Sequence, residues 1–319
     1  MTVSILIPIY NVERYVARCL RSVFEQSYYD IEYVLIDDCS SDLSLKIVRD
    51  IINEYPSRLN QIKLFTNEKN LGISETRNRL LDNATGDYVY FIDSDDYIDL
   101  DAVKSLVDIV NISNADVVRS NYYLCTTNNK VLKENVLSSN LQSYLENAII
   151  SVDSMNSLWK LFIRRHLFLH NSLRFDTQIN VCEDYLMTIK LFFYSKKIVD
   201  VHSSFYYYTN YNENSITNNL NLMNENKISS LLEVISFLKD KGIYEQFKNV
   251  IFYRMVISKQ HYLLNRNCFN LDMYYKYFPE SNSYWRRLKY GIRERCLFWL
   301  AEYKLDFFIN LYYKLSNFR

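Results

Sequence analysis

Short apolar runs alternate with segments of helical periodicity through the first 120 residues, and this alternation constrains the fold more than any other feature. The apolar runs are 3–9, 31–36, 62–65, 88–92 and 115–118. The segments between them that carry one apolar helical face are 12–23, 43–55, 73–83 and 100–112. Repeated βα units pair their strands in parallel and cover both faces of the sheet with helices. We therefore predict an α/β fold with a mostly parallel sheet flanked by helices.

Polar residues follow three of the predicted strands. The first strand runs into 8–11, the second into 37–42 and the fourth into 93–96. In parallel α/β sheets, ligands bind beyond the carboxyl ends of the strands. Because these ends lie on one edge of the sheet, we expect a single site built from all three segments.

The rest of the chain is organised differently. Residues 121–219 are less regular, while 220–264 carry two segments of helical periodicity. The sequence contains no long linker and no internal repeat. We expect 1–120 and 121–219 to be two parts of one domain, followed by a helical region over 220–319.

Composition excludes several classes of protein. Lys+Arg 37 and Asp+Glu 37 balance, which argues against a broadly basic nucleic-acid binder. Neither G-x-G-x-x-G nor a P-loop motif follows the first strand, which argues against a dinucleotide dehydrogenase and a P-loop NTPase. The six cysteines form no C-x-x-C pair, no apolar stretch reaches 18 residues, and Pro8 interrupts the apolar start. We therefore expect a cytoplasmic protein with reduced thiols and no membrane-spanning helix.

Asp93-Ser94-Asp95 is the most specific motif in the chain. Two carboxylates at i and i+2, directly after the buried run 88–92, can present oxygen atoms to Mg²⁺ or Mn²⁺. Acidic residues also favour the first turn of a helix, so helix capping is the alternative interpretation. The polar segments after two neighbouring strands favour a metal site.

Several motifs occur in an order that resembles a known family. They are Pro8-Ile9-Tyr10-Asn11, Ile36-Asp37-Asp38-Cys39-Ser40-Ser41-Asp42, Asn70-Leu71-Gly72-Ile73-Ser74-Glu75-Thr76-Arg77-Asn78, Gly86-Asp87-Tyr88 and Phe91-Ile92-Asp93-Ser94-Asp95-Asp96. Together they resemble the family 2 inverting glycosyltransferases, strongly over 1–120 and moderately over 150–216. The resemblance implies the Rossmann-like GT-A fold, with nucleotide-sugar binding in 1–120 and the acceptor and catalytic base in 121–219. Residues 220–319 match no family motif.

The resemblance implies which residues bind the donor, a UDP-sugar. The implied nucleotide-sugar contacts are Pro8, Tyr10, Asp38, Arg77, Asp93 and Ser94. The Asp38 carboxylate would accept a hydrogen bond from uracil N3–H, which cytosine lacks. Two alternatives remain open: Asp38 could cap the helix that follows it, and Arg77 could pair with a carboxylate on a helix.

The resemblance also implies a Mn²⁺ or Mg²⁺ cofactor. Asp95 would be its ligand, Asp93 would approach the metal or the ribose, and Asp96 is a further candidate ligand. Such a cation would neutralise charge on the donor diphosphate.

The pair Glu183-Asp184 matches the family's acidic pair, in which the aspartate is the catalytic base. A carboxylate near the acceptor hydroxyl would remove its proton during attack on the anomeric carbon. An acidic pair is also favoured at any helix N-terminus by the helix dipole, which is the structural alternative.

The resemblance therefore predicts inverting, metal-assisted transfer from a UDP-sugar to a hydroxyl of a glycan or lipid-linked glycan, in bacterial capsule, exopolysaccharide or lipopolysaccharide synthesis. Two other classes of protein stay open. A sugar-1-phosphate nucleotidyltransferase would also use carboxylate-bound metal, although it should carry a Gly-rich phosphate loop after the first strand. A non-catalytic glycan-binding protein could retain the fold.

The last 36 residues, 284–319, are basic and aromatic, with eight Lys or Arg, three Asp or Glu and a net charge of +5. The apolar residues predicted to share one helical face are Ile292, Cys296, Trp299, Leu300, Tyr303 and Phe307. Such a helix is typical of peripheral contact with the anionic inner face of a membrane. The alternatives are packing on the core and packing on a second subunit, as in a homodimer.

Overall fold

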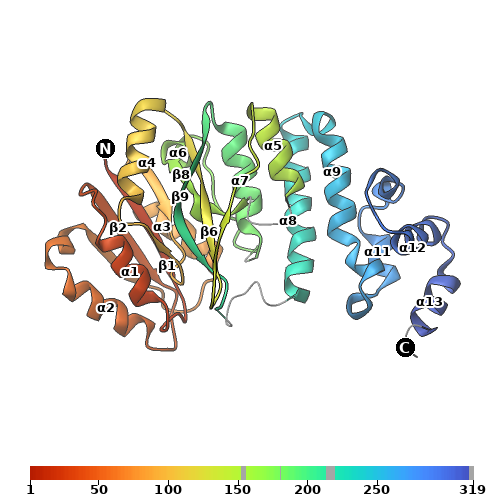
Figure 1. Cartoon of the computed structure of the whole chain (residues 1–319), viewed down its shortest axis with the longest axis horizontal. Coiled ribbons are helices and arrows are strands. Elements are labelled where there is room, and N and C mark those ends of the chain that lie inside the picture. The colour runs from red at the N-terminus through yellow and green to blue at the C-terminus, as the bar shows by residue number, and fades with distance from the viewer. Residues whose placement is uncertain (152–155, 180, 213–219, 316–319) are drawn as a thin grey trace. The chain divides into compact units, whose positions relative to one another are not determined.

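The computed structural model describes residues 1–151, 156–179, 181–212 and 220–315 (Figure 1). The chain divides into two compact units, one of residues 1–148 and 153–218 and the other of residues 149–152 and 219–319. None of the helices in the described part of the chain has the length and hydropathy that a membrane-spanning segment needs.

The first unit is built on a nine-stranded sheet with the order β3-β2-β1-β4-β8-β6-β9-β5, and β7 pairs with β6. The strands are β1 (Val3–Ile9), β2 (Ile31–Asp37), β3 (Ile62–Thr66), β4 (Tyr88–Phe91), β5 (Tyr97–Ile98), β6 (Val117–Cys125), β7 (Lys130–Lys133), β8 (Leu161–Arg164) and β9 (Ile198–Thr209). Strands β3, β2, β1 and β4 pair in parallel, as do β6 and β9, whereas β8, β5 and β7 pair antiparallel. The α/β class is confirmed, with an unbroken run of parallel strands in the amino-terminal half.

Helices cover both faces of this sheet (Figure 1). They are α1 (Val16–Phe24), α2 (Ser44–Glu54), α3 (Ile73–Asn83), α4 (Ala102–Ser113), α5 (Leu141–Ile150), α6 (His166–His170) and α7 (Glu183–Tyr194). The bounds of α3 agree with the prediction at both ends. The predicted strand 115–118 overlaps the start of β6, which begins at Val117 and continues to Cys125 because it pairs with β9 across a register shift at Ser120 and Asn121.

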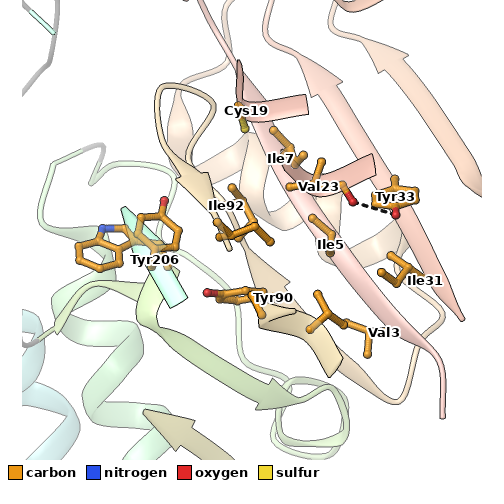
Figure 2. Close-up of a cluster of buried hydrophobic side chains, with 14 of the residues drawn as sticks. Val3, Ile5, Ile7, Cys19, Val23, Ile31, Tyr33, Tyr90, Ile92 and Tyr206 are labelled. Carbon is orange, nitrogen blue, oxygen red and sulfur yellow. Dashed lines mark hydrogen bonds between the residues drawn. The ribbon is translucent and has the colours of Figure 1, made fainter. Parts of the chain in front are cut away.

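Packing on both faces of β1 explains why its sequence is a continuous apolar run. Every residue of β1 is buried, since helices pack on both of its faces. On one face, Ile5 and Ile7 pack with Val23 of α1 and with Tyr33 of β2, whose hydroxyl donates to the Val23 carbonyl at 3.0 Å (Figure 2). Tyr206 of β9 belongs to the same cluster, so this core reaches across the sheet from the first strand to the last long one.

The second unit is helical. Its helices are α8 (Leu220–Asp240), α9 (Tyr244–Lys259), α10 (His261–Leu264), α11 (Leu271–Lys276), α12 (Ile292–Glu302) and α13 (Asp306–Leu315). The single helix predicted through Ile292 and Phe307 is wrong, because the chain turns between α12 and α13. Lys304 has a φ of 53° there, a left-handed conformation that a continuous α-helix does not allow.

Candidate functional site

The polar segments after β1, β2 and β4 meet at one edge of the sheet, as predicted. In the parallel pairings, Ile9 of β1 lies opposite Asp37 of β2. The backbone N–H of Asn11 donates to Ser40 Oγ at 3.1 Å, which joins the first two segments. The thiol of Cys19 on α1 lies 3.7 Å from the carbonyl oxygen of Asp93, in the third segment. All three segments therefore border one region.

The carboxylate of Asp38 organises the turn that precedes α3. Its Oδ1 accepts hydrogen bonds from Asn67 Nδ2 at 2.6 Å and from the Leu71 N–H at 2.8 Å. Its Oδ2 accepts one from the Gly72 N–H at 2.9 Å, and Gly72 has a φ of 85° that favours glycine. A carboxylate has about four lone-pair sites, and these contacts use three. By this count one acceptor position is left, on Oδ2 of a side chain that is 4% exposed.

The structure places Pro8 and Tyr10 at the same strand end as Asp38. Pro8 is buried in β1 opposite Ile36 of β2. Tyr10 follows the strand, and its side chain is 45% exposed. The Tyr10 ring is therefore accessible to a ligand, whereas the side chain of Pro8 is not.

Asp93, Ser94 and Asp95 form a tight segment directly after β4. The Asp93 side chain is 28% exposed, and Ser94 is buried. Burial, and secondly the charge of Asp93, raise the pKa of Asp95 to about 6. Asn212 Nδ2 donates to Asp95 Oδ2 at 2.8 Å, and Arg18 donates to the Asp95 carbonyl at 2.9 Å. The segment therefore concentrates negative charge where water is scarce.

Asp96 does not face this region, and its proposed role as a metal ligand is corrected. Its carboxyl is completely buried, with Oδ2 accepting from the Tyr206 hydroxyl at 2.7 Å and Oδ1 from the Thr209 N–H at 2.6 Å. Burial, and then the charges of Asp95 and Asp93, raise the pKa of Asp96 well above its usual range. A buried carboxyl with both oxygens engaged is a poor cation ligand. Asp96 instead ties the loop to β9.

Replacing Tyr206 with Phe tests this structural role. The Tyr206 hydroxyl also accepts from the Asp93 N–H at 3.1 Å, so its removal leaves two polar groups without this partner. We expect the free energy of unfolding to fall by about 1–3 kcal/mol in chemical denaturation. The control is Tyr207→Phe, whose hydroxyl donates to the partly exposed Asp99 and can be replaced by water. Equal losses in the two variants would contradict the structural role of Asp96.

Arg77 of α3 joins the Asp93 segment to the acidic pair. Its side chain is 7% exposed, and Nη2 lies 3.4 Å from Asp93 Oδ1. Nη1 forms an ion pair with Glu183, at the start of α7. The alternative that Arg77 pairs with a helix carboxylate therefore holds, and that carboxylate belongs to the predicted catalytic pair. One guanidinium thus holds together groups that are 90 residues apart in sequence.

Asp184 lies in the first turn of α7, next to Glu183. Cys182 precedes the helix with a φ of 62°, which sets the direction in which α7 begins. Burial, and secondly the charge of Glu183, raise the pKa of Asp184 to about 8, although the Arg77 charge opposes the shift. Glu183 forms the ion pair with Arg77, so the two neighbouring carboxylates have different surroundings. A carboxylate with a raised pKa near neutrality is suited to accept a proton.

Sequence reasoning did not assign three further residues at this edge. Arg18 of α1 donates to Thr209 Oγ1 at 2.8 Å and to the Tyr211 hydroxyl at 2.6 Å, in addition to the Asp95 carbonyl. Its guanidinium also lies 4.3 Å from the centre of the Tyr97 ring. Arg18 on α1 carries no motif of its own, whereas Tyr206 and Asn212 reach the loop because β9 returns to it. Asn214 and Ser215, which belong to the resembling stretch, lie outside the described residues.

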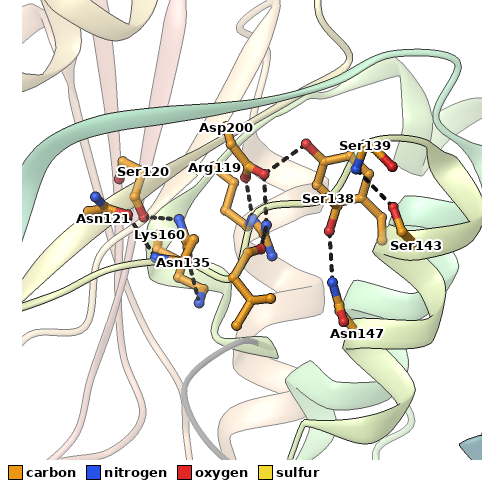
Figure 3. Close-up of polar contacts among 12 residues, drawn as sticks. Arg119, Ser120, Asn121, Asn135, Ser138, Ser139, Ser143, Asn147, Lys160 and Asp200 are labelled. Carbon is orange, nitrogen blue, oxygen red and sulfur yellow. Dashed lines mark hydrogen bonds and ion pairs between the residues drawn. The ribbon is translucent and has the colours of Figure 1, made fainter.

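A buried polar network joins β6 to β9 (Figure 3). Arg119 of β6 is completely buried and pairs with Asp200 of β9 at 2.5 Å, and Tyr144 of α5 donates to the same carboxylate at 2.9 Å. Lys160 donates to Asn135 at 3.2 Å. Burial, and secondly the charge of Arg119, lower the pKa of Lys160 well below its usual range, whereas Asp200 and Asp184 oppose this shift. Lys160 is therefore the member of this network that responds to the charge of Asp184.

The donor set fits a hard divalent cation. Asp93 and Asp95 raise the local negative charge, and a cation between them would relieve the repulsion that raises the pKa of Asp95. Among the residues that the structure describes, no three His, Cys, Asp or Glu side chains are grouped so as to hold a metal ion by themselves. A cation here would thus need ligands from the substrate, as Mg²⁺ commonly takes from phosphates.

Comparison with known proteins identifies similar sequences. The model of the family described as glycosyl transferase family 2 matches residues 4–169, just over half of the chain. The chain is 30% identical over 220 residues to glycosyltransferase GlyA of Streptococcus pneumoniae, a match that covers 65% of this chain but 30% of GlyA. It is 28% identical over 297 residues to the cholesterol galactosyltransferase of Borreliella burgdorferi, covering 86% of this chain and 80% of that protein.

Solved structures show the same fold. The crystal structure of S. aureus TarS 1-349 in complex with UDP-GlcNAc superposes with a TM-score of 0.65 at 22% identity, covering 89% of this chain and 83% of that one. At this identity, the likeness establishes the fold rather than the substrate. TarS of S. aureus is named as a poly(ribitol-phosphate) beta-N-acetylglucosaminyltransferase.

Proposed function

This chain belongs to glycosyl transferase family 2, and from that membership we propose that it transfers a sugar from a UDP-sugar to a hydroxyl of a glycan acceptor, with inversion and with the help of a divalent cation. The observation that carries the proposal is the contact of Arg77 with both Asp93 and Glu183. Through it, the candidate donor site after β4 and the candidate base at the start of α7 border one region. An enzyme that joins two substrates needs this proximity.

The donor end of the site favours uridine. Asp38 keeps one acceptor position on Oδ2 after it has bound the turn 70–72, and N3–H of uracil can donate to it. Tyr10 supplies an exposed ring at the same strand end, and Pro8 supplies backbone groups. In the sequence, Ser94 lies between Asp93 and Asp95, the two candidate metal ligands. The naming of UDP and UDP-GlcNAc in the TarS complexes supports a UDP-sugar.

The chemistry we propose is a single displacement. Asp184 accepts the proton of the acceptor hydroxyl while that oxygen bonds to the anomeric carbon of the donor. The bond from this carbon to the diphosphate oxygen breaks on the opposite side, so the anomeric configuration inverts. Asp95, with Asp93, would hold Mn²⁺ or Mg²⁺. When bound, such a cation offsets the negative charge that develops on the leaving diphosphate.

The acceptor we propose is a growing surface glycan, free or lipid-linked, in bacterial capsule, exopolysaccharide or lipopolysaccharide synthesis. Two relatives support this class from their names alone, since one acts on poly(ribitol-phosphate) and the other on cholesterol. Both of these named acceptors bear hydroxyl groups.

A UDP-release assay over a panel of UDP-sugars, with and without Mn²⁺, tests the proposal. We expect release from one or a few donors, and only with the divalent cation. Pyrophosphate release from UTP and a sugar 1-phosphate would instead identify a nucleotidyltransferase. Binding of a UDP-sugar without turnover of any donor or acceptor would identify a non-catalytic glycan-binding protein.

A further inference from the structure

The last two described helices expose an unusual number of large apolar side chains. Of the 21 such side chains exposed in the described part of the chain, seven lie within α12, α13 and the turn that joins them. They are Ile292, Trp299, Tyr303, Phe307, Phe308, Leu311 and Leu315, between 39% and 85% exposed. We call these seven residues the tail face.

The tail face follows helical spacing. Ile292, Trp299 and Tyr303 recur at i, i+7 and i+11, which places them along one side of α12 and its end. Phe307, Leu311 and Leu315 recur at intervals of four along α13, with Phe308 beside them. Each helix therefore presents an apolar stripe instead of isolated exposed residues.

The opposite sides of both helices already pack inside the second unit. Leu297, Phe298 and Ala301 of α12 and Ile309 of α13 are at most 2% exposed. The indole of Trp285 stacks on the Phe298 ring with their centres 5.9 Å apart. The helices thus have an inner face that holds them in the fold, and the tail face is not needed for that packing.

Exposed cations occur in the same stretch of chain as the tail face, and two of its three carboxylates are paired. All seven described Lys and Arg side chains from residue 284 onward are exposed: Arg286, Arg287, Lys289, Arg293, Arg295, Lys304 and Lys314. The three carboxylates of the same region are only partly exposed. Glu302 pairs with Arg286 at 3.0 Å, Glu294 pairs with Arg293 at 3.4 Å, and Asp306 accepts from the Tyr275 hydroxyl.

We propose that the tail face docks on a lipid bilayer that contains anionic headgroups. Aromatic and aliphatic side chains would enter the boundary between headgroups and acyl chains, while the exposed cations of the same stretch contact the anionic headgroups. At 11 and 10 residues, α12 and α13 are too short to cross a bilayer, so they would lie on it. This inference does not depend on the proposed catalytic function.

The charge argues against a second copy of this chain as the occupant. Two identical tail faces in contact would bring together two regions that each carry seven Lys or Arg against three carboxylates, and therefore repel each other. The aliphatic side chains of Ile292, Leu311 and Leu315 argue against nucleic acid, which offers stacking surfaces for rings but no apolar phase.

Vesicle flotation of the full chain tests the proposal. The probes are vesicles of phosphatidylcholine alone and of phosphatidylcholine with phosphatidylglycerol at about 7:3. We expect the protein to float with the anionic vesicles and to stay behind with the neutral ones.

The double variant Phe307→Ser/Leu311→Ser should lose at least about tenfold in vesicle partitioning, since it removes apolar area from the bilayer boundary. The charge variant Lys289→Glu/Lys314→Glu should lose a similar amount, and high salt should reproduce that loss.

Matched variants in the first unit control for changes of composition. Ile112→Ser removes a 90% exposed side chain from α4, and Lys46→Glu/Lys104→Glu makes the same charge change on α2 and α4. Both should float as the unaltered protein does, and thermal unfolding should show all variants folded. Flotation that is absent, equal on neutral vesicles, or unchanged in both tail variants would overturn the proposal. A dimer that the apolar variant converts to monomer, without flotation, would assign the face to a second copy.

Discussion

Replacing Asp184 with Asn should lower kcat for sugar transfer by about 10²–10⁴-fold, the usual contribution of a general base, while UDP-sugar affinity changes little. Asparagine keeps the shape of the side chain but cannot accept the acceptor's proton. The position of Asp184 in the first turn of α7, whose Glu183 is paired with Arg77, supports this role. Kinetics with the donor identified by UDP release, together with calorimetric binding of UDP, measures both quantities.

The pH profile gives a second measure of the same group. Because the pKa of Asp184 is raised to about 8, kcat/KM should rise with pH through the neutral range, as the carboxyl loses its proton. Glu183→Gln is the informative partner variant. It removes the neighbouring charge that helps to raise this pKa, so the rising limb should move to lower pH while turnover is retained. Because the two carboxylates titrate together, the limb reports the pair.

The free energy of unfolding, measured as a function of pH, provides the control for Asp184→Asn. A carboxyl whose pKa is raised by folding binds its proton more tightly in the folded state. Its contribution to stability is therefore complete below its usual pKa near 4 and is lost as pH rises toward about 8. The neutral Asn variant should be at least as stable as the unaltered protein at pH 9, with a smaller difference at pH 5. A variant that is inactive but destabilised at pH 9, or one with normal kcat, would contradict the assignment.

Replacing Asp95 with Asn should weaken Mn²⁺ binding in the presence of UDP by about 100-fold or more. Changes that only affect the partners of metal ligands typically cost 10–100-fold, and this change removes a ligand charge. The side chain should stay in place, since an Asn oxygen can still accept from Asn212. Electron paramagnetic resonance of Mn²⁺, read without turnover, separates this effect from catalysis.

Asp99→Asn is the matched control for Asp95→Asn. It removes the same charge four residues further along the loop, from a carboxylate that accepts from Tyr207. Mn²⁺ affinity should change little in this variant. If Asp95→Asn and Asp99→Asn bind Mn²⁺ equally well, the carboxylates after β4 do not hold the cation.

Local periodicity is sufficient to predict most of the strands and helices within residues 1–120. The runs at β1, β2 and β4 are apolar because both faces of these strands are covered, whereas β3 lies at the edge of the sheet and is only partly buried. The bounds of α3 agree with the prediction at both ends. The order of motifs likewise pointed to the edge where the strands end. The predicted tail helix failed because sequence periodicity does not register the left-handed turn at Lys304.

The sequence by itself determined the alternation of strands and helices, and with it the edge where acidic residues gather, because both follow from patterns within a few residues. Tertiary structure alone decided which carboxylates face that edge. Asp95 and Asp96 are neighbours in sequence, yet Tyr206 and Thr209 enclose only Asp96, because β9 returns to the loop more than 100 residues later. The pairing of Arg77 with Glu183 spans a similar separation. Such contacts depend on chain packing, and no local pattern encodes them.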